Sequence, residues 1–350
     1  MKQDVSSFES LAGQAVAPLL EKVASGEIPA IAAGVINTKG DISTSYHGFA
    51  QLVPEQIPLR PEYLFDLASL TKVLFTTIEI MRLIEEGAFN LESQLFELIP
   101  DIGQYDAQAP IRKITIGQCL SHQTFLPAVA PIYTYGDDAE TLKAYILQND
   151  WPQGPPVYSD INFMLLGFVI ERFRNCKLTQ MPLPDGFEIN PPAEKCVATE
   201  HCQWRGRVLR GQVHDENAFS LGGLSGHAGL FASLGSVLQM AHGLLNASIL
   251  PLKAIDTMWQ TQNETRCLGW EHRNAHWQGG QACSTNSVGH TGFTGTGLWI
   301  DIERGLAWAL LTNRVHPSRF DPVSIADERI QFSNSIISLF EGFRSGKVHV

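Results

Sequence analysis

The chain has 350 residues, of which 44% are hydrophobic and 17% charged, and its formal net charge at pH 7 is −11. This length and composition allow a sizeable core and leave no room for a large disordered region. The negative charge argues against nucleic acid or an anionic membrane surface as a partner.

The start of the chain and its cysteines bear on location. Residues 1–10 lack the basic start and the uninterrupted apolar stretch of a secretory signal, and no apolar run is long enough to span a bilayer. The six cysteines are scattered and form no Cys-x-x-Cys pair. We therefore expect a cytoplasmic protein with free thiols and no membrane partner. Cys196, His201 and Cys202 are close in sequence, but adjacent side chains point poorly toward one ion, so we expect no metal there.

The first predicted elements are a helix and a β-hairpin. Residues 7–25 carry apolar side chains at helical spacing and end near Gly26, which predicts a helix covering a sheet. Residues 30–48 have the pattern of two strands joined by a turn at 37–40.

The remaining elements change in type along the chain. Residues 69–249 are mainly helical segments separated by loops rich in proline and glycine. Strands are predicted again at 267–271, 297–302 and 306–312, followed by a last helix at 324–340.

This order of elements predicts an α/β (α+β) fold. An antiparallel sheet would be built from both termini and flanked by helices, with a mainly helical region inserted. The sheet region would be discontinuous, over residues 1–68 and 260–350, and the helical region would cover 69–259. We expect the active site at their junction, within one unit.

Ser69 and Lys72 are the first candidate catalytic residues, in the motif Ser69-Leu-Thr-Lys72. A serine hydroxyl needs a nearby group to take its proton, and a lysine can do this where its surroundings lower its pKa. Residues three apart share a helix face, and a helix is predicted from Val73 to Glu86. The alternative is a solvated lysine, but the neighbours of Lys72 are apolar and indicate that it is half buried.

Tyr158 is the second candidate, in the motif Tyr158-Ser-Asp160 at the start of another apolar helix. A phenol can pass a proton from a serine to a leaving group, with Lys72 as the adjacent cation. Asp160 and Asn162 could hold the lysine or a substrate amide. The alternative is a loop tyrosine followed by a helix cap.

The third feature is the glycine-rich stretch Gly289-His-Thr-Gly-Phe-Thr-Gly-Thr-Gly297. Its glycines let the backbone come close to a ligand, and it lacks the Gly-Lys-Ser/Thr ending of a phosphate loop. His290 could contact a substrate carboxylate or assist proton transfer; alternatively, it is a surface imidazole on an edge strand.

A further polar cluster comes from His214, Asp215 and Glu216, followed by the glycine-rich residues 221–231. Consecutive side chains diverge, so we interpret this segment as support for the site wall and expect no metal.

Together, these motifs resemble the serine β-lactamase and penicillin-binding-protein superfamily, specifically its branch of class C β-lactamases, DD-peptidases and esterases. Ser69-Leu-Thr-Lys72 matches the first motif, Tyr158-Ser-Asp160 the Tyr-x-Asn motif and His290-Thr-Gly292 the Lys-Thr-Gly motif. Residues 120–124 are similar to the family's Leu-Leu-Thr-His-Thr-Ser-Gly loop, and residues 213–218 and 226–231 to a subgroup with cell-wall carboxypeptidases.

The resemblance implies a role for each matching residue. Ser69 would be the acylated nucleophile, Lys72 its base and Tyr158 the proton shuttle. The backbone N–H groups of Ser69 and Phe293 would hold the oxyanion. The resemblance implies no metal and no cofactor.

The expected substrate-binding and oxyanion residues are Asp160, Thr291, Gly292 and Phe293. Two residues of the matching motifs, Asp160 and His290, depart from the family's pattern. Asp160 replaces an asparagine, so an amide donor becomes an acceptor that can repel a carboxylate. His290 replaces the lysine that would bind a substrate carboxylate. Both changes weaken the case for β-lactam hydrolysis and leave the acylation machinery in place.

We therefore expect a serine hydrolase that acts through an acyl-enzyme on small esters, amides or peptides. One alternative is a DD-carboxypeptidase or weak β-lactamase. Another is a catalytically idle binding protein with the same fold. A metallohydrolase built on His214, Asp215 and His227 is a third alternative, which we consider weaker.

Overall fold

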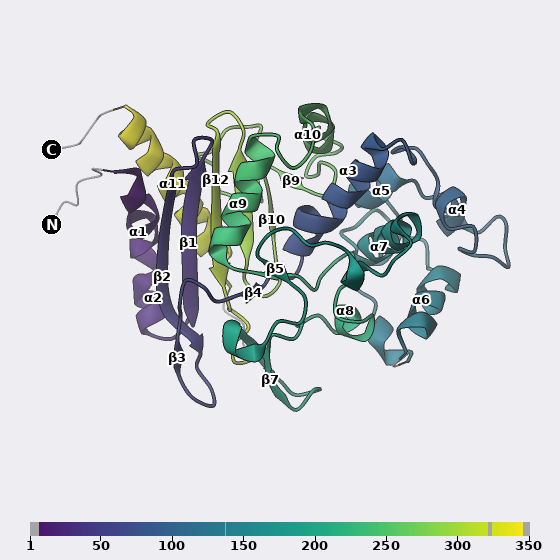
Figure 1. Cartoon of the computed structure of the whole chain (residues 1–350), viewed down its shortest axis with the longest axis horizontal. Coiled ribbons are helices and arrows are strands. Elements are labelled where there is room, and N and C mark those ends of the chain that lie inside the picture. Colours follow the sequence, from purple (N-terminus) through teal and green to yellow (C-terminus); the bar gives the residue numbers. More distant parts are fainter. Residues whose placement is uncertain (1–6, 137, 321–323, 346–350) are drawn as a thin grey trace.

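A seven-stranded antiparallel sheet occupies one side of the molecule, and most helices lie on the other side (Figure 1). The computed structural model describes residues 7–136, 138–320 and 324–345. The strand order is β3-β2-β1-β12-β11-β10-β9. These strands are β1 (Ala30–Asn37), β2 (Ile42–Gln51), β3 (Ile57–Pro58), β9 (Glu271–His272), β10 (Val288–Thr291), β11 (Gly297–Asp301) and β12 (Leu306–Thr312).

The two ends of the chain meet in the middle of this sheet. β1 pairs with β2 on one side and with β12 on the other, with Ala33 opposite Leu310. The hairpin at 30–48 and the strands at 297–302 and 306–312 are therefore confirmed. The strand predicted at 267–271 is wrong in extent, because only Glu271 lies in β9. The N–H groups of Leu268 and Gly269 donate to the carbonyls of Met258 and Leu120 instead.

Helices cover both faces of the sheet. One face packs against α1 (Leu11–Val16) and α11 (Ala326–Arg344), and α2 (Leu20–Ala24) contacts β2. The other face packs against α9 (Leu234–Leu245). Successive side chains of a strand point to opposite faces, and β1 is buried on both. Ile31 packs in the hydrophobic cluster on the side of α1 and α11, and Ala32 packs in the cluster on the side of α9.

Two predicted helices differ in detail from those in the structure. The N-terminal one is interrupted by a 3-10 turn over Ala17–Leu19, which contains Pro18; a proline lacks the N–H that continues an α-helix. The C-terminal one begins at Ala326 and extends to Arg344.

The inserted region is mainly helical and shares one hydrophobic core with the sheet, since the same cluster holds Leu298 of β11 and Phe163 of α7. Its helices are α3 (Thr77–Glu85), α4 (Leu95–Leu98), α5 (Ile116–Leu120), α6 (Ala139–Gln148), α7 (Asp160–Arg174), α8 (Glu216–Ser220) and α10 (Leu252–Trp259). No described helix is long and apolar enough to cross a membrane.

Two small sheets in this region were not predicted. One joins β4 (Phe65–Asp66), β8 (Phe231–Ala232) and β5 (Phe187–Glu188), and the other joins β6 (Ala198–Cys202) and β7 (Arg207–Arg210). Most of these strands are only two residues long, too short for an alternating pattern to reveal. β4 leads directly into the turn before Ser69, so it places the candidate nucleophile.

Candidate active site

Ser69 and Lys72 are in contact at the junction between the sheet and the helices. The ammonium of Lys72 donates a hydrogen bond of 2.8 Å to Ser69 Oγ. Ser69 directly precedes a helix whose first full turn, Lys72–Thr76, is π-helical and continues into α3. Single π-helical turns occur often at functional sites. Lys72 is fully buried, whereas Ser69 is half-buried.

The turn before Ser69 is held by the carboxylate of Asp66. This buried side chain accepts the N–H groups of Ala68 at 2.9 Å and His214 at 2.6 Å. Ala68 adopts a φ of 46°, which is unusual for a residue other than glycine. Such backbone strain is commonly kept at functional sites, and here it sets the direction from which Ser69 enters the site.

Lys72 has acidic and carbonyl partners in addition to Ser69. Its ammonium lies 2.7 Å from Oδ1 of Asp160 and donates to the carbonyl of His227 at 3.2 Å. Burial lowers the pKa of Lys72, but the charges of Asp160 and Tyr158 raise it by more, so the net direction is upward. The lowered pKa that a resting lysine base requires is therefore not found, and Lys72 is an ammonium in this arrangement.

Tyr158 lies among these groups and is half-buried. The centre of its ring is 5.0 Å from the ammonium of Lys72 and 5.1 Å from the guanidinium carbon of Arg266. The rings of His122 and His290 are centred 4.4 Å and 5.9 Å from it. Two cations and two imidazoles thus surround one phenol, and a negative charge that forms on its oxygen would lie in a positive field.

His290 is a neutral imidazole in this site. Its Nδ1 contacts the carbonyl of Thr291 at 2.9 Å, while its buried Nε2 has no partner within the described residues. Burial, followed by the charges of Arg266 and Lys72, lowers the pKa of His290 well below its usual 6.5. His290 therefore does not replace the positive charge of the lysine that the motif would otherwise carry.

The residues after His290 pack against the backbone before Ser69. The hydroxyls of Thr294 and Thr296 donate to the carbonyls of Asp66 and Leu67 at 2.7 Å and 3.0 Å. A Cβ on Gly292 would meet the Leu67 carbonyl oxygen at 2.6 Å, so only glycine allows this approach.

Two backbone donors remain free near this contact. Over the described ranges, the N–H groups of Ser69 and Phe293 have no hydrogen-bond acceptor. The buried Arg329 holds the same loop through the carbonyls of Gly292 and Thr296, at 3.2 Å and 2.7 Å. Two free N–H groups fixed on adjoining segments are suited to receive an oxyanion.

The sequence had not singled out His122 and Arg266 as site residues. His122 lies in the loop 120–124, and its Nδ1 accepts the N–H of Ser159 at 3.1 Å. Burial lowers its pKa well below the usual value, with Arg266 adding to the effect. Arg266 comes from the segment between α10 and β9, and no sequence motif marks it; only the fold brings it to Tyr158.

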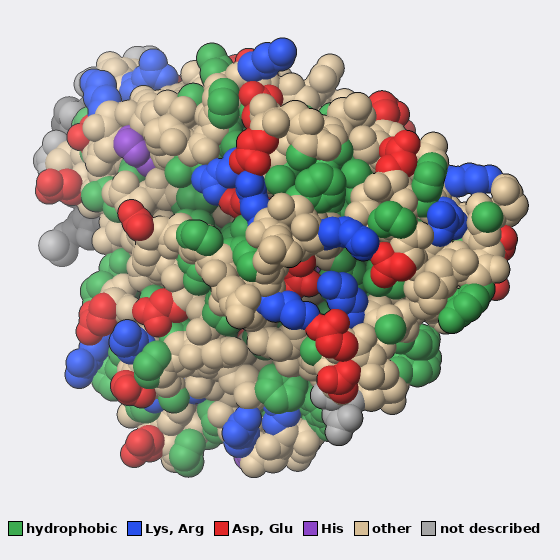
Figure 2. All heavy atoms as spheres, turned by 45° about the vertical axis from the view of Figure 1, so that its right-hand side comes forward, with side chains coloured by type: hydrophobic (Ala, Val, Ile, Leu, Met, Phe, Trp, Pro, Cys, Tyr) green, Lys and Arg blue, Asp and Glu red, His purple; other side chains and the backbone are tan. Residues whose placement is uncertain are grey.

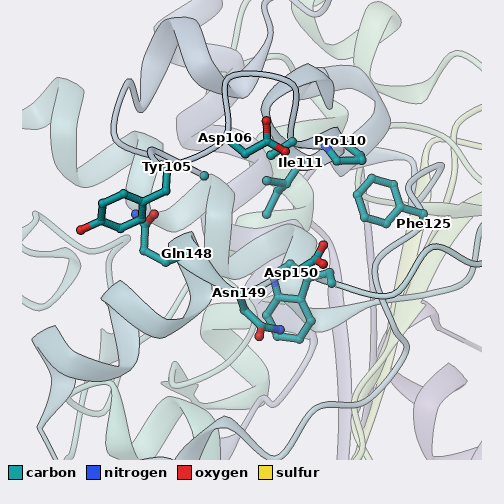
Figure 3. Close-up of a pocket in the computed structure, with 11 residues that line it drawn as sticks. Tyr105, Asp106, Pro110, Ile111, Phe125, Gln148, Asn149 and Asp150 are labelled. Atoms are coloured by element: carbon teal, nitrogen blue, oxygen red, sulfur yellow. The ribbon is translucent and has the colours of Figure 1, made fainter.

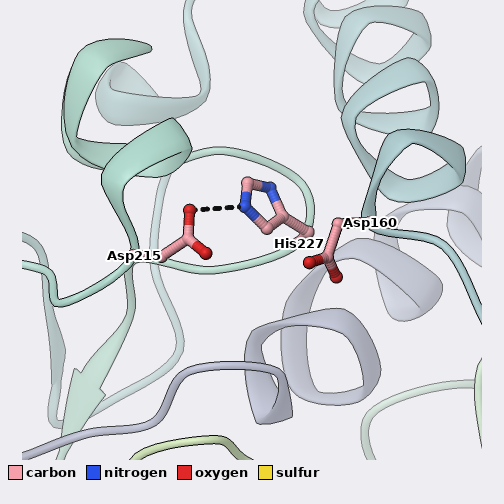
Figure 4. A group of neighbouring side chains, drawn as sticks. All are labelled: Asp160, Asp215 and His227. Carbon is pink, nitrogen blue, oxygen red and sulfur yellow. Dashed lines mark hydrogen bonds and ion pairs between the residues drawn. The ribbon is translucent and has the colours of Figure 1, made fainter. Parts of the chain in front are cut away.

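Asp160, Asp215 and His227 form a group with potential ligand atoms within 4.8 Å of one another (Figure 4). Asp160 is already paired with Lys72, and Asp215 is 2.8 Å from Nε2 of His227. The Lys72 ammonium already compensates the negative charge of Asp160. The three side chains therefore do not offer a metal ion the uncompensated charge that would attract it. His214 is not part of it and contacts Glu200 at 3.0 Å, so the three residues of the metallohydrolase alternative do not converge.

A separate pocket of about 230 Å³ lies in the helical region, where Tyr105, Ile111, Phe125 and Trp151 are among the residues that line it (Figure 3). No predicted site residue contributes to its wall. We therefore place the candidate chemistry at Ser69 and not in this pocket.

The sequence matches the Beta-lactamase family over residues 14–330. It is 30% identical over 332 residues to the N-acetylmuramyl-L-alanine amidase of Bacillus subtilis (strain 168), covering 80% of this chain and 74% of that protein. It is also 29% identical over 312 residues to a putative D-alanyl-D-alanine carboxypeptidase of Escherichia coli (strain K12), covering 74% of this chain and 71% of that protein.

Solved structures share the fold. A class C beta-lactamase superposes with a TM-score of 0.74 at 15% identity, covering 95% of this chain and 97% of the other. The simvastatin synthase LovD from Aspergillus terreus superposes with a TM-score of 0.69 at 18% identity, covering 92% and 96%. The predicted fold class is therefore confirmed.

Proposed function

Because the chain belongs to the β-lactamase family and is a serine hydrolase of the acyl-enzyme type, we propose that Ser69 carries the acyl group and that the substrates are small esters or amides. Ser69 Oγ would attack the carbonyl carbon, and the bond to the alcohol or amine would break. Water would then attack the ester on Ser69, releasing the acid. The 2.8 Å contact between Lys72 and Ser69 carries this assignment.

We assign the proton transfers to Tyr158, with Lys72 as the fixed cation beside it. Lys72 is bound to Asp160 and holds its proton, so its role is to orient Ser69 Oγ and to stabilise negative charge. Tyr158 would act as a relay: as its oxygen receives the proton of Ser69, its own proton passes to the leaving group. In the second step its oxygen receives a proton of the attacking water while its own proton returns to Ser69 Oγ. Asp160 is a positioning residue, since it acts through Lys72.

The oxyanion of the tetrahedral intermediate would be held by the N–H groups of Ser69 and Phe293. Both are free within the described residues, and Gly292 lets their segments approach. Thr291 and the neutral His290 would line the same edge, where His290 Nε2 offers a lone pair to a substrate N–H or O–H.

A second candidate function is a DD-carboxypeptidase or a weak β-lactamase. Two relatives carry the names N-acetylmuramyl-L-alanine amidase and putative D-alanyl-D-alanine carboxypeptidase. A peptide substrate of this class would use the same acylation steps at Ser69. A cytoplasmic location stays a prediction from the sequence.

Intact-mass measurement after exposure to a p-nitrophenyl ester, a fluorophosphonate and a penicillin tests these functions together. Adducts with the ester and the phosphonate that vanish in Ser69→Ala are expected. An additional penicillin adduct would favour the carboxypeptidase or β-lactamase function. If no reagent modified Ser69, the chain would be an idle binding protein of this fold.

A further inference from the structure

Arg329 contacts the turn between β10 and β11 from the start of α11, the C-terminal helix. The residue is 5% exposed. Its Nη2 donates to the carbonyls of Gly292 and Thr296, at 3.2 Å and 2.7 Å, and its Nη1 donates to Oε1 of Gln278 at 2.6 Å. One guanidinium therefore holds both ends of the turn that carries Phe293.

This guanidinium is a buried charge that no acid balances. Within residues 7–136, 138–320 and 324–345, Arg329 forms no ion pair with a carboxylate, and its buried Nε makes no hydrogen bond. Burial and the charge of Arg314 lower the pKa of Arg329 to about 9, so the side chain is still a cation at neutral pH. Charged side chains are rarely buried without an opposite charge, which indicates that this one serves the neighbouring site.

The carbonyl of Gly292 and the N–H of Phe293 belong to the same peptide group. That N–H has no acceptor among the described residues and is one of the two donors that we assign to the oxyanion. A peptide group is conjugated, so a cation that donates to its oxygen draws electron density from its nitrogen. Hydrogen bonds in series strengthen one another for this reason. The charge of Arg329 thus acts on the N–H that would meet the oxyanion.

The other donor and the other nearby arginine are arranged differently. The N–H of Ser69 belongs to a peptide whose carbonyl accepts the neutral N–H of Thr71 at 3.0 Å. Arg314 Nε donates to the carbonyl of Phe293 at 2.9 Å, but this carbonyl is part of the following peptide group. Among the described side chains, Arg329 is therefore the cation bound to the peptide that supplies an oxyanion donor.

We propose that Arg329 strengthens the oxyanion site by polarising the peptide group between Gly292 and Phe293. The inference rests on the proposed function, in which the N–H of Phe293 donates to the oxyanion. The substrate oxygen gains negative charge as its carbon becomes tetrahedral, and a polarised N–H binds that charge more strongly than it binds the uncharged carbonyl. Arg329 touches no reacting atom, so it is a positioning residue that acts on the transition state.

Two esters test this inference: 4-nitrophenyl acetate and its thiono analogue, in which sulfur replaces the carbonyl oxygen. In both, Ser69 Oγ forms a bond to the carbonyl carbon, the bond to the aryl oxygen breaks, and the leaving phenol receives a proton relayed through Tyr158. The negative charge of the intermediate lies on oxygen in one and on sulfur in the other, and sulfur is the weaker hydrogen-bond acceptor. Release of 4-nitrophenol gives kcat/KM, which is divided by the rate constant of the same ester with hydroxide.

Gln278→Glu is the sharpest variant, because it keeps Arg329 in place and supplies the carboxylate that Arg329 lacks. The preference for the oxygen ester should fall about fivefold, as expected when a charged donor is compensated, with no loss of thermal stability. Arg329→Gln should lower the preference at least as much, and Arg329→Lys should keep part of it.

Arg304→Gln is the matched control. Arg304 also joins the sheet to α11, through Glu341, but it lies beyond Asp301 at the other end of β11. Its loss should leave the preference for the oxygen ester unchanged.

An unchanged preference in both Gln278→Glu and Arg329→Gln would overturn the inference and leave the proposed function standing. If only Arg329→Gln lowered the preference, Arg329 would act by holding the turn in place, and the proposed effect of its charge would be wrong. If neither ester were hydrolysed, or if Ser69→Ala hydrolysed both at the wild-type rate, the proposed function would fail and the inference with it. Thermal unfolding identifies a variant that misfolds; should Arg329→Gln do so, Gln278→Glu decides alone.

Discussion

The ammonium of Lys72 lies 2.7 Å from a carboxylate oxygen of Asp160, and the lysine side chain is fully buried. A buried ammonium without a partner would lose its proton, because burial disfavours the charged form. The carboxylate reverses this effect and raises the pKa of Lys72. One residue, an aspartate where the Tyr-x-Asn motif has an amide, therefore sets the charge of the group that touches Ser69.

Asp160→Asn should lower the pKa of Lys72 by removing this charge. If the Lys72 ammonium is needed for acylation, the alkaline limb of the profile of kcat/KM against pH should move to lower pH. The raised pKa also makes a stability contribution that is present below 10.5 and is lost as the pH rises through the folded value. Ester hydrolysis from neutral to alkaline pH measures the first effect, and urea unfolding over the same range measures the second.

Asp101→Asn is a matched control for this variant. Asp101 pairs with Arg172 at the same 2.7 Å, but both side chains are 49% exposed. We expect a loss of about 2 kcal/mol for Asp160→Asn and below about 1 kcal/mol for Asp101→Asn. An unchanged alkaline limb in Asp160→Asn would show that the charge of Lys72 does not limit the reaction.

The two histidines of the site should not contribute a titration near neutral pH. Burial and nearby cations lower the pKa of both His122 and His290 well below 6.5. Between about pH 5 and pH 8, kcat/KM should therefore lack a limb from an imidazole. Profiles of the wild type and His290→Gln check this. A limb near neutrality that disappears in His290→Gln would contradict it.

Glu200 should stabilise the wall of the site at neutral pH. Its carboxylate contacts His214 at 3.0 Å and Arg319 at 2.8 Å. Burial raises the pKa of Glu200, but His214 and Arg319 lower it by more, to about 2. The contribution is therefore present above 4.5, the usual value, and is lost as the pH falls toward 2.

Glu200→Gln should cost about 2 kcal/mol at pH 7, because Arg319 loses the more buried of its two carboxylate partners and keeps Glu216, 2.6 Å away. Urea unfolding at pH 7 and at pH 4 should show a smaller difference from wild type at the lower pH. Glu92→Gln, at an exposed position, serves as control and should be close to neutral. An equal loss in the free energy of unfolding for both variants would mean that the contacts of Glu200 with His214 and Arg319 do not stabilise the fold.

Periodicity and turn residues predicted the large elements well. The hairpin around residues 37–40 and the strands of the C-terminal half depend on local patterns, and the structure contains them. The absence of a strand over residues 267–270 could not be predicted. The backbone groups of this segment bind Met258 and Leu120, which are distant in sequence.

The residues of the candidate site likewise divide into those that the sequence predicted and those that it did not. Short motifs singled out Ser69 and Lys72, and the structure places them in contact. The charge of Lys72 depends on an ion pair across two helices, which residue types alone do not define. Arg266 has no motif at all, because its position follows from the packing of a loop beside Tyr158. On the face shown in Figure 2, acidic and basic side chains are interspersed. The net charge of the chain therefore gave no indication of where the site lies.

Gly292 should be essential for the oxyanion site because of the space that it leaves. A Cβ there would lie 2.2 Å from Thr296 Oγ1 and 2.6 Å from the Leu67 carbonyl oxygen, far inside normal contact. Gly292→Ala must therefore push the loop carrying Phe293 away from Ser69. Loss of one oxyanion donor costs about 100-fold or more in kcat. We expect a loss of this size with little change in KM, measured with a p-nitrophenyl ester. Gly342→Ala in α11 meets no atom within 4 Å and should keep full activity. Wild-type kcat in Gly292→Ala would exclude the N–H of Phe293 as an oxyanion donor.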